Sequence, residues 1–210
     1  RASGPVCQNT GKLIEERAFG SETNSAFGDD LLPTGSIMNT ALVIIDMQND
    51  FVLPDAPLCV KGALATVPTI RELLDQARKQ GWRVIHVIRQ HRPDGSDVEI
   101  GRAALFTDGK GICIPGTPGA QIVDELAPLP QETVLRKLRF SAFFQTELDM
   151  LLRRLKVDTV VVAGTQYPNC VRGTAVDAMS HDYRTIVVTD ACSAQTEEIA
   201  AANIRDMRNM

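Results

Sequence analysis

The chain has 210 residues, of which 44% are hydrophobic and 23% are charged, so it can form one domain with a full hydrophobic core. Its formal net charge of -4 gives no electrostatic reason to expect nucleic acid or an anionic membrane as a partner. The sequence also lacks an apolar run of the roughly 18 to 20 residues that a membrane span requires. We therefore expect the partner to be a small-molecule substrate.

Five cysteines are spread along the chain, and their spacing shows neither a CxxC pair nor a Cys/His zinc pattern. An odd number of cysteines at wide spacing does not indicate a disulfide framework. We expect a reducing compartment and a cytoplasmic protein, and import into an organelle by the N-terminal segment stays open.

The first 38 residues are rich in Gly, Ser, Thr and Asn and show little hydrophobic periodicity. This composition predicts a flexible N-terminal extension over residues 1–38. The remaining residues, 39–210, show no composition shift and no internal repeat, and we expect them to form a single domain.

From residue 40 onward, short β-branched apolar runs alternate with amphipathic helical segments at the spacing of βαβ units. The predicted strands are residues 41–45, 83–88, 133–136, 159–163 and 185–189. The predicted helices are residues 67–80, 120–126, 145–155, 170–181 and 196–210. The irregular stretch from 89 to about 117 is predicted to be a functional loop. This order predicts an α/β fold with three αβα layers and a doubly wound, mostly parallel, Rossmann-like sheet.

Three reactive side chains, Asp46, Lys137 and Cys170, each follow or end a predicted strand. In such sheets, ligands bind outside the carboxyl ends of the strands. Cys170 can act as a nucleophile, Asp46 as its general base and later acid, and Lys137 as a cation that lowers the thiol pKa and orients Asp46. Each also has an ordinary explanation: Cys170 can be a buried inert thiol, Asp46 a loop cap, and Lys137 a solvated charge at the end of a strand.

At these residues the chain resembles the isochorismatase-like cysteine hydrolases, which include nicotinamidases and N-carbamoylsarcosine, ureidoacrylate and biuret amidohydrolases. The resemblance covers residues 40–210. It rests on ALVIIDMQNDF with Asp46, VLRKLRFSAFFQTEL with Lys137 and VVVAGTQYPNCVRGTAVDA with Cys170. It implies that an Asp-Lys-Cys triad hydrolyses a C–N bond of a small amide, ureide or carbamoyl compound through a thioester on Cys170.

The resemblance also implies an oxyanion hole formed by the turn before the nucleophile. It places a cis peptide bond between Gln166 and Tyr167, with the N–H groups of Tyr167 and Cys170 as donors. An ordinary trans turn is the alternative. Pro168 departs from the residue that is usual in the family, and it has no N–H to donate.

Nicotinamidases hold a metal on an Asp-x-His-x5-His motif, and the corresponding residues here are Arg89, His91 and Asp97. Two of these three positions depart from the motif, and Arg89 would repel a cation. We therefore predict no catalytic metal, and we treat these three residues as candidate substrate contacts. Further candidate contacts, each of which can equally be structural, are Gln48, Asn49, Phe51, Ser141, Phe143 and Arg172.

No P-loop and no GxGxxG after a strand is present, so no nucleotide or other cofactor is predicted. Two other functions stay open: hydrolysis of a vinyl ether as in isochorismatases, and a catalytically silent family member that acts by binding or assembly. The resemblance implies a homo-oligomer, either a dimer or a tetramer. Family members usually add a sixth strand after the final helix, whereas this sequence ends in helical residues at Met210, which leaves open that the domain lacks its last strand.

Overall fold

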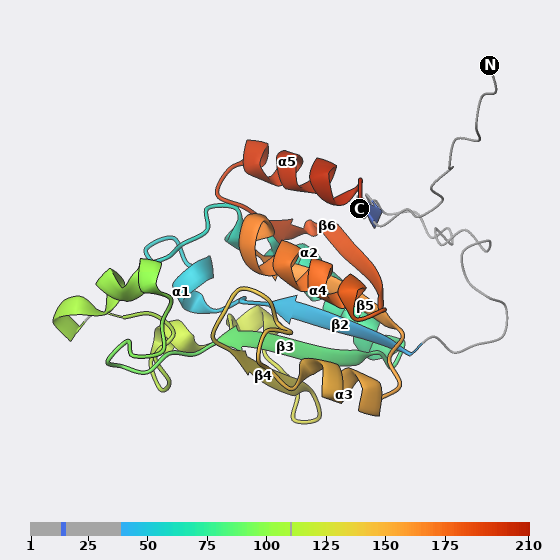
Figure 1. Cartoon of the computed structure of the whole chain (residues 1–210), viewed down its shortest axis with the longest axis horizontal. Helices are drawn as coiled ribbons and strands as arrows, with labels where there is room; N and C mark the ends of the chain where they lie inside the picture. Colours follow the sequence, from blue (N-terminus) through green and yellow to red (C-terminus); the bar gives the residue numbers. More distant parts are fainter. Residues whose placement is uncertain (1–13, 16–38, 110) are drawn as a thin grey trace, which may run out of the picture.

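The computed structural model describes residues 14–15, 39–109 and 111–210. The predicted extension over residues 1–38 therefore lies outside the described residues, apart from the two-residue strand Ile14–Glu15. The helices and strands of the domain are shown in Figure 1. Within the described part of the chain, no helix is both long and apolar enough to cross a membrane.

A parallel sheet forms the centre of the domain (Figure 1). Its strands lie in the order β1-β6-β5-β2-β3-β4, and each neighbouring pair is parallel. The bounds are β1 Ile14–Glu15, β2 Thr40–Ile45, β3 Arg83–Arg89, β4 Thr133–Lys137, β5 Thr159–Thr165 and β6 Arg184–Ser193. The central strands β2 and β5 are buried along their whole length, which explains why they read as continuous apolar runs rather than as alternating ones.

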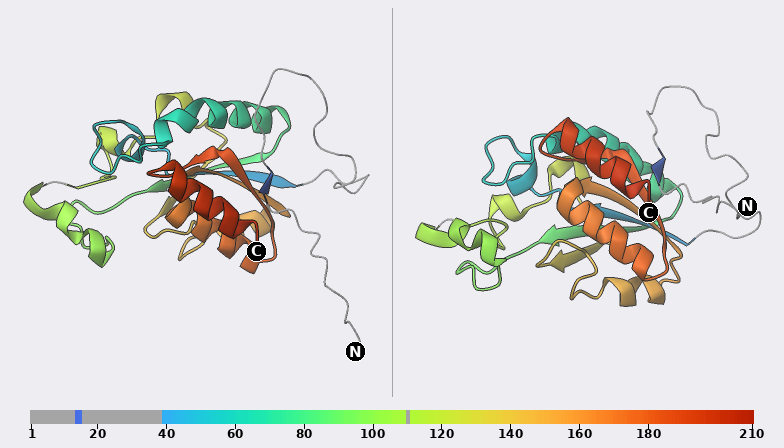
Figure 2. Two further views of the ribbon diagram at one scale, coloured as in Figure 1. Left: turned by 90° about the horizontal axis from the view of Figure 1, so that it is seen from above. Right: turned by 45° about the horizontal axis from the view of Figure 1, so that its top comes forward.

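Helices cover both faces of the sheet, as Figure 2 shows. The helices are α1 Asn49–Val52, α2 Ala63–Lys79, α3 Leu148–Arg154, α4 Arg172–Ser180 and α5 Glu197–Met207. On one face, α2 packs Ile70 and Leu74 against the β2 residues Leu42 and Ile44. On the other face, α3, α4 and α5 pack against the alternate strand residues, such as Val43. The predicted three-layer αβα fold is thereby confirmed.

One predicted helix is wrong. Residues 120–126 do not form an α-helix but belong to two short 3-10 helices, η2 Pro118–Ala120 and η3 Asp124–Leu126. Between them, Ile122 forms an isolated bridge with Gln48, and the Val123 N–H donates to the Met47 carbonyl at 3.0 Å. These backbone hydrogen bonds to the loop after β2 replace those that a continuous helix would make.

The long stretch after β3 contains the 3-10 helix η1, Ile100–Gly109, which the sequence pattern did not predict. In Figure 1 this green segment stands out from the body of the domain on the side where β3 ends. Ile100 is 97% exposed, whereas Ile112 and Cys113 pack with Phe51 in a small cluster at the base of the segment. The stretch is therefore anchored at its end and projects over the carboxyl edge of the sheet.

Candidate active site

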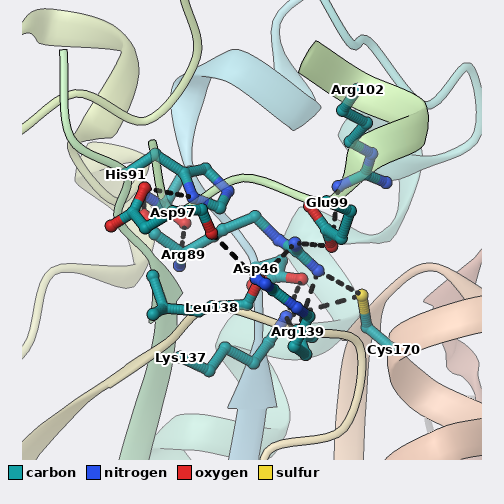
Figure 3. Close-up of polar contacts among 11 residues, drawn as sticks. Asp46, Arg89, His91, Asp97, Glu99, Arg102, Lys137, Leu138, Arg139 and Cys170 are labelled. Atoms are coloured by element: carbon teal, nitrogen blue, oxygen red, sulfur yellow. Dashed lines mark hydrogen bonds and ion pairs between the residues drawn. The ribbon is translucent and has the colours of Figure 1, made fainter. Parts of the chain in front are cut away.

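The ends of three strands bring Asp46, Lys137 and Cys170 together (Figure 3). Asp46 follows β2, Lys137 is the last residue of β4, and Cys170 lies in the turn after β5. The Lys137 Nζ donates to Asp46 Oδ2 at 2.6 Å and lies 3.5 Å from Cys170 Sγ. The three residues are 2%, 1% and 5% exposed, so the ammonium holds a carboxylate and a thiol in a site closed to bulk water.

Cys170 does not open a helix as we predicted. It lies within the π-helical turn η4, Tyr167–Val171, and α4 begins only at Arg172. Burial raises the pKa of the Cys170 thiol, and the negative charge of Asp46 adds to this rise. The positive charges of Lys137 and Arg89 oppose it. The charge of Lys137 thus acts on the thiol pKa in the direction we predicted, but burial outweighs it and the net shift is upward.

A second cation, Arg89, reaches the same thiol. It ends β3 directly beside Lys137 in the sheet register, and its side chain is fully buried. Its Nη2 lies 3.6 Å from Cys170 Sγ and donates to the Arg139 carbonyl at 3.1 Å, while Nη1 donates to the Leu138 carbonyl at 3.2 Å. Burial opposes its charge, but Asp46, Cys170 and Glu99 outweigh burial and raise the pKa of Arg89.

Glu99 pairs with Arg89 through Nη1 and is a site residue that the sequence reasoning missed. Its carboxylate also lies 3.7 Å from Arg102 Nη1. Burial alone would raise the pKa of Glu99, but the charge and hydrogen bond of Arg89, a backbone hydrogen bond and the charge of Arg102 together outweigh burial and lower the pKa. The only signal in the sequence was its place in the long segment after a strand end, where function is common.

His91 and Asp97 lie next to this group but face each other. The His91 Nδ1 lies 3.3 Å from Asp97 Oδ1, and Asp97 Oδ2 accepts from Arg136 at 3.1 Å. Burial and the charge of Arg89 lower the pKa of His91, while Asp97 opposes this lowering.

The residues at the position of the nicotinamidase metal do not fit a metal ion. The first ligand position holds the guanidinium of Arg89, which already pairs with a carboxylate. Among the described residues, no three His, Cys, Asp or Glu side chains form a group that could hold a metal ion.

Three of the candidate contacts after β2 are tied to neighbouring loops. The Gln48 amide is fully buried, donates to the carbonyls of Arg89 and Ala120 at 2.9 and 2.8 Å, and accepts from the Arg89 N–H at 2.7 Å. Asn49 donates to the Pro118 carbonyl at 2.8 Å, and Phe51 packs in the small cluster at the base of the long segment. These contacts hold the loops around Arg89, and a direct contact of these residues with substrate stays a prediction.

A cavity of about 550 Å³ lies beside the turn that carries Cys170. Ser141 and Arg172 line it, together with Phe140 and Asn169. Arg172 also pairs with Asp206 at the surface, at 2.5 Å. The third candidate on this side, Phe143, turns into the core and stacks on His181 with ring centroids 5.1 Å apart. The structure thus brings Ser141 and Arg172 to a cavity but not Phe143.

The cis peptide bond lies one residue earlier than predicted, between Thr165 and Gln166 rather than between Gln166 and Tyr167. The predicted position followed from the family motif alone. In the structure β5 extends to Thr165, which pairs with Ser193 of β6, so the cis bond directly follows the end of the strand. Tyr167 is fully buried and its hydroxyl donates to the Thr189 carbonyl at 2.7 Å. Its N–H and that of Cys170 stay predicted oxyanion donors.

Known proteins share this domain. Residues 40–210 match the isochorismatase domain. The chain belongs to the isochorismatase family. A structure of an isochorismatase family protein from Desulfovibrio vulgaris superposes with a TM-score of 0.81 at 63% sequence identity, covering 82% of this chain and 91% of that one.

Two named relatives carry different activities in their names. A probable inactive nicotinamidase of Arabidopsis thaliana is 45% identical over 175 residues, which covers 82% of this chain and 89% of the relative. A maleamate amidohydrolase of Pseudomonas putida is 38% identical over 170 residues, which covers 80% of this chain and 78% of the relative. The isochorismatase family member described here is thus similar to proteins named for amide hydrolysis, one of which is named as probably inactive.

Proposed function

We propose that this protein is a cysteine-dependent amidohydrolase that cleaves a non-peptide C–N bond of a small amide, ureide or carbamoyl compound. The single observation that carries the proposal is the buried ammonium of Lys137, which contacts both Asp46 Oδ2, at 2.6 Å, and Cys170 Sγ, at 3.5 Å. Similarity to amidohydrolases within the family supports amide hydrolysis in the broad sense.

In the first half of the reaction, Cys170 Sγ attacks the substrate carbonyl while its proton passes to Asp46. The raised pKa of the thiol makes this base necessary, because the free thiol is protonated near neutral pH. Asp46 then returns the proton to the leaving nitrogen, the C–N bond breaks, and ammonia or an amine departs. The acyl group remains on Cys170 as a thioester.

In the second half, Asp46 takes a proton from water and the resulting hydroxide attacks the thioester carbonyl. The C–S bond then breaks, the carboxylic acid product departs, and Asp46 returns the proton to the Cys170 thiolate. Lys137 keeps the carboxylate oriented throughout, because its ammonium is held between Asp46 and the Arg139 carbonyl at 3.2 Å. N–H groups near Tyr167 and Cys170 are proposed to stabilise the oxyanion that forms at the carbonyl.

The name of the Arabidopsis relative favours one alternative, a catalytically silent protein that uses the same pocket for binding. The presence of all three side chains, with Lys137 in contact with both Asp46 and Cys170, supports catalysis instead.

Ammonia release from a panel of amides and ureides tests the proposal. The panel contains nicotinamide, biuret, ureidoacrylate, N-carbamoyl amino acids and succinamate. We expect the wild type to release ammonia from at least one compound, Cys170→Ala to be inactive, and Cys192→Ala to retain activity. Cys192 is the matched control because it is also a buried free thiol, on β6 and 6% exposed. Equal turnover by wild type and Cys170→Ala would refute covalent catalysis.

A further inference from the structure

The Arg89 guanidinium is placed to bind an anion beside the nucleophile. It is fully buried, and it contacts Cys170 Sγ at 3.6 Å through the same Nη2 that bonds the Arg139 carbonyl. A guanidinium matches a carboxylate because its N–H groups form a planar fork. An anion held here would therefore lie directly next to the thiol that is proposed to attack the substrate.

A carboxylate of the protein itself, that of Glu99, contacts this guanidinium, but the match is incomplete. Only Oε1 contacts Arg89, and the buried Oε2 has no hydrogen-bond partner among the residues that the structure describes. The buried Nε of Arg89 likewise has no partner in the described part of the chain. The ion pair thus leaves one donor, Arg89 Nε, and one acceptor, Glu99 Oε2, without a hydrogen bond. A carboxylate that bonds the guanidinium through both oxygens would leave neither group unpaired.

Glu99 lies at the start of a largely exposed segment. It directly precedes η1, whose first residue, Ile100, is 97% exposed. Besides Arg89, its carboxylate contacts Arg102 at 3.7 Å, and Arg102 lies over the Phe140 ring at 5.5 Å. The segment stands out from the domain in both views of Figure 2, and none of its described residues belongs to the two core clusters on the faces of the sheet.

Charge also favours exchange of one carboxylate for another. Asp46 balances Lys137, and Glu99 balances Arg89 (Figure 3). If Glu99 leaves, the buried Arg89 needs another anion. A neutral amide cannot supply it, whereas a substrate that carries a carboxylate can.

We infer that Arg89 binds the carboxylate of a small carboxylate-bearing amide or ureide, and that Glu99 occupies this carboxylate position until the substrate displaces it. The recognition of an amide rests on the proposed function, whereas the binding of a carboxylate at Arg89 does not. The short distance from Arg89 to Cys170 requires the carboxylate and the scissile carbonyl to be separated by only a few bonds.

Calorimetric titration with succinate tests the binding step, because succinate has two carboxylates and no C–N bond to hydrolyse. We expect Arg89→Gln to bind succinate at least tenfold more weakly than the wild type. Glu99→Gln should bind it about tenfold more tightly, because no internal carboxylate competes. The matched control is Arg136→Gln, an arginine on β4 that is half exposed and pairs with Asp97, and its affinity should be unchanged. The neutral analogue 1,4-butanediol should not distinguish the variants.

Unchanged succinate affinity in Arg89→Gln, or no tighter binding by Glu99→Gln, would overturn the inference. If Arg89→Gln does not fold, Arg89→Lys keeps the cation but loses the fork, and it should still weaken binding at least fivefold.

Turnover separates this inference from the proposed function. Succinamate and butyramide present the same amide with and without a carboxylate, and Arg89→Gln should reduce kcat/KM at least tenfold more for succinamate. Equal loss for both compounds would refute the carboxylate site while leaving amide hydrolysis intact. If succinate binding depends on Arg89 but the protein turns over no compound of the panel, the carboxylate site is supported and the proposed amide hydrolysis is refuted.

Discussion

At the scale of single residues, the site depends on two cations around one thiol. Lys137 and Arg89 lie side by side at the ends of β4 and β3 and both contact Cys170 Sγ, at 3.5 and 3.6 Å. Their charges nevertheless do not overcome burial, and the pKa of the thiol remains raised. The proposed mechanism therefore assigns Asp46 the role of base, and its ion pair with Lys137 orients the carboxylate.

Substitution of Lys137 by Met should strongly reduce activity and destabilise the fold. The change leaves the Asp46 carboxylate buried without its cation, which costs about 3–5 kcal/mol of unfolding free energy. We expect kcat/KM to fall at least about 100-fold, as for loss of general acid–base catalysis. Urea denaturation measures the stability. The double variant Asp46→Asn, Lys137→Met should regain part of it, and a single variant within about 1 kcal/mol of wild type would contradict the role of the pair.

At the scale of secondary-structure elements, a second buried ionic group joins α2 to the sheet, far from the thiol. Glu132, just before β4, accepts from Arg78 of α2 at 2.7 Å and lies 3.1 Å from the Nε2 of His86 on β3. Burial would raise the pKa of Glu132, but hydrogen bonds from Arg78, the Leu129 N–H and His86 outweigh it and lower the pKa to about 2.

This lowered pKa predicts a pH-dependent contribution to stability. A carboxyl group whose pKa is lower in the folded chain stabilises the fold above its unfolded pKa of about 4.5, and the contribution disappears as pH falls toward 2. Glu132→Gln should therefore be about 3 kcal/mol less stable than wild type at pH 7, and the gap should narrow between pH 4.5 and 2. Urea unfolding at several pH values measures it, and a gap that is constant with pH would contradict the assignment.

The close approach of β5 to β2 near the site depends on Gly164. Its φ is +113°, and a Cβ there would lie 2.2 Å from the Ile45 carbonyl oxygen. Gly164→Ala should therefore lower the unfolding free energy by about 3 kcal/mol or more. Gly81→Ala is the control, because Gly81 has φ +71° but nothing within 4 Å of its Cβ position, and it should cost only about 1–2 kcal/mol. Equal losses in thermal or urea unfolding would refute a steric role for Gly164.

At the scale of the whole molecule, the fold could be predicted because the same apolar runs that favour strands locally are the ones that a sheet covered on both faces requires. Buried β-branched runs occur only where a strand is covered on both faces, so five strands and their order in the chain followed from the pattern. The meeting of Asp46, Lys137 and Cys170 followed from the common edge of parallel strands.

Other features depend on contacts that no local pattern encodes. Glu99 and Glu132 reach their partners from segments without periodicity, and η2 and η3 replace a predicted helix because Ile122 pairs with Gln48. The cis bond lies one residue before the position that the family motif implied, directly after the last β5 residue that pairs with β6. Such details require the neighbouring strand or loop to be in place.

The assembly of the whole protein stays a prediction. A homo-dimer or homo-tetramer is expected, and sedimentation velocity measures it directly. The chain has a mass of 22.9 kDa, so a species at two or four times this mass would agree with the expectation. A single species at the monomer mass across micromolar concentrations would contradict it.

The most direct test of the central claim is capture of the thioester on Cys170. A reaction with the best substrate of the panel is quenched in acid within milliseconds, and the peptides are analysed by mass spectrometry. We predict an adduct on the Cys170 peptide with the mass of the substrate minus its leaving ammonia or amine, present in wild type and absent in Cys170→Ala. Turnover that persists in Cys170→Ala, with no adduct on the Cys170 peptide of the wild type, would contradict the claim.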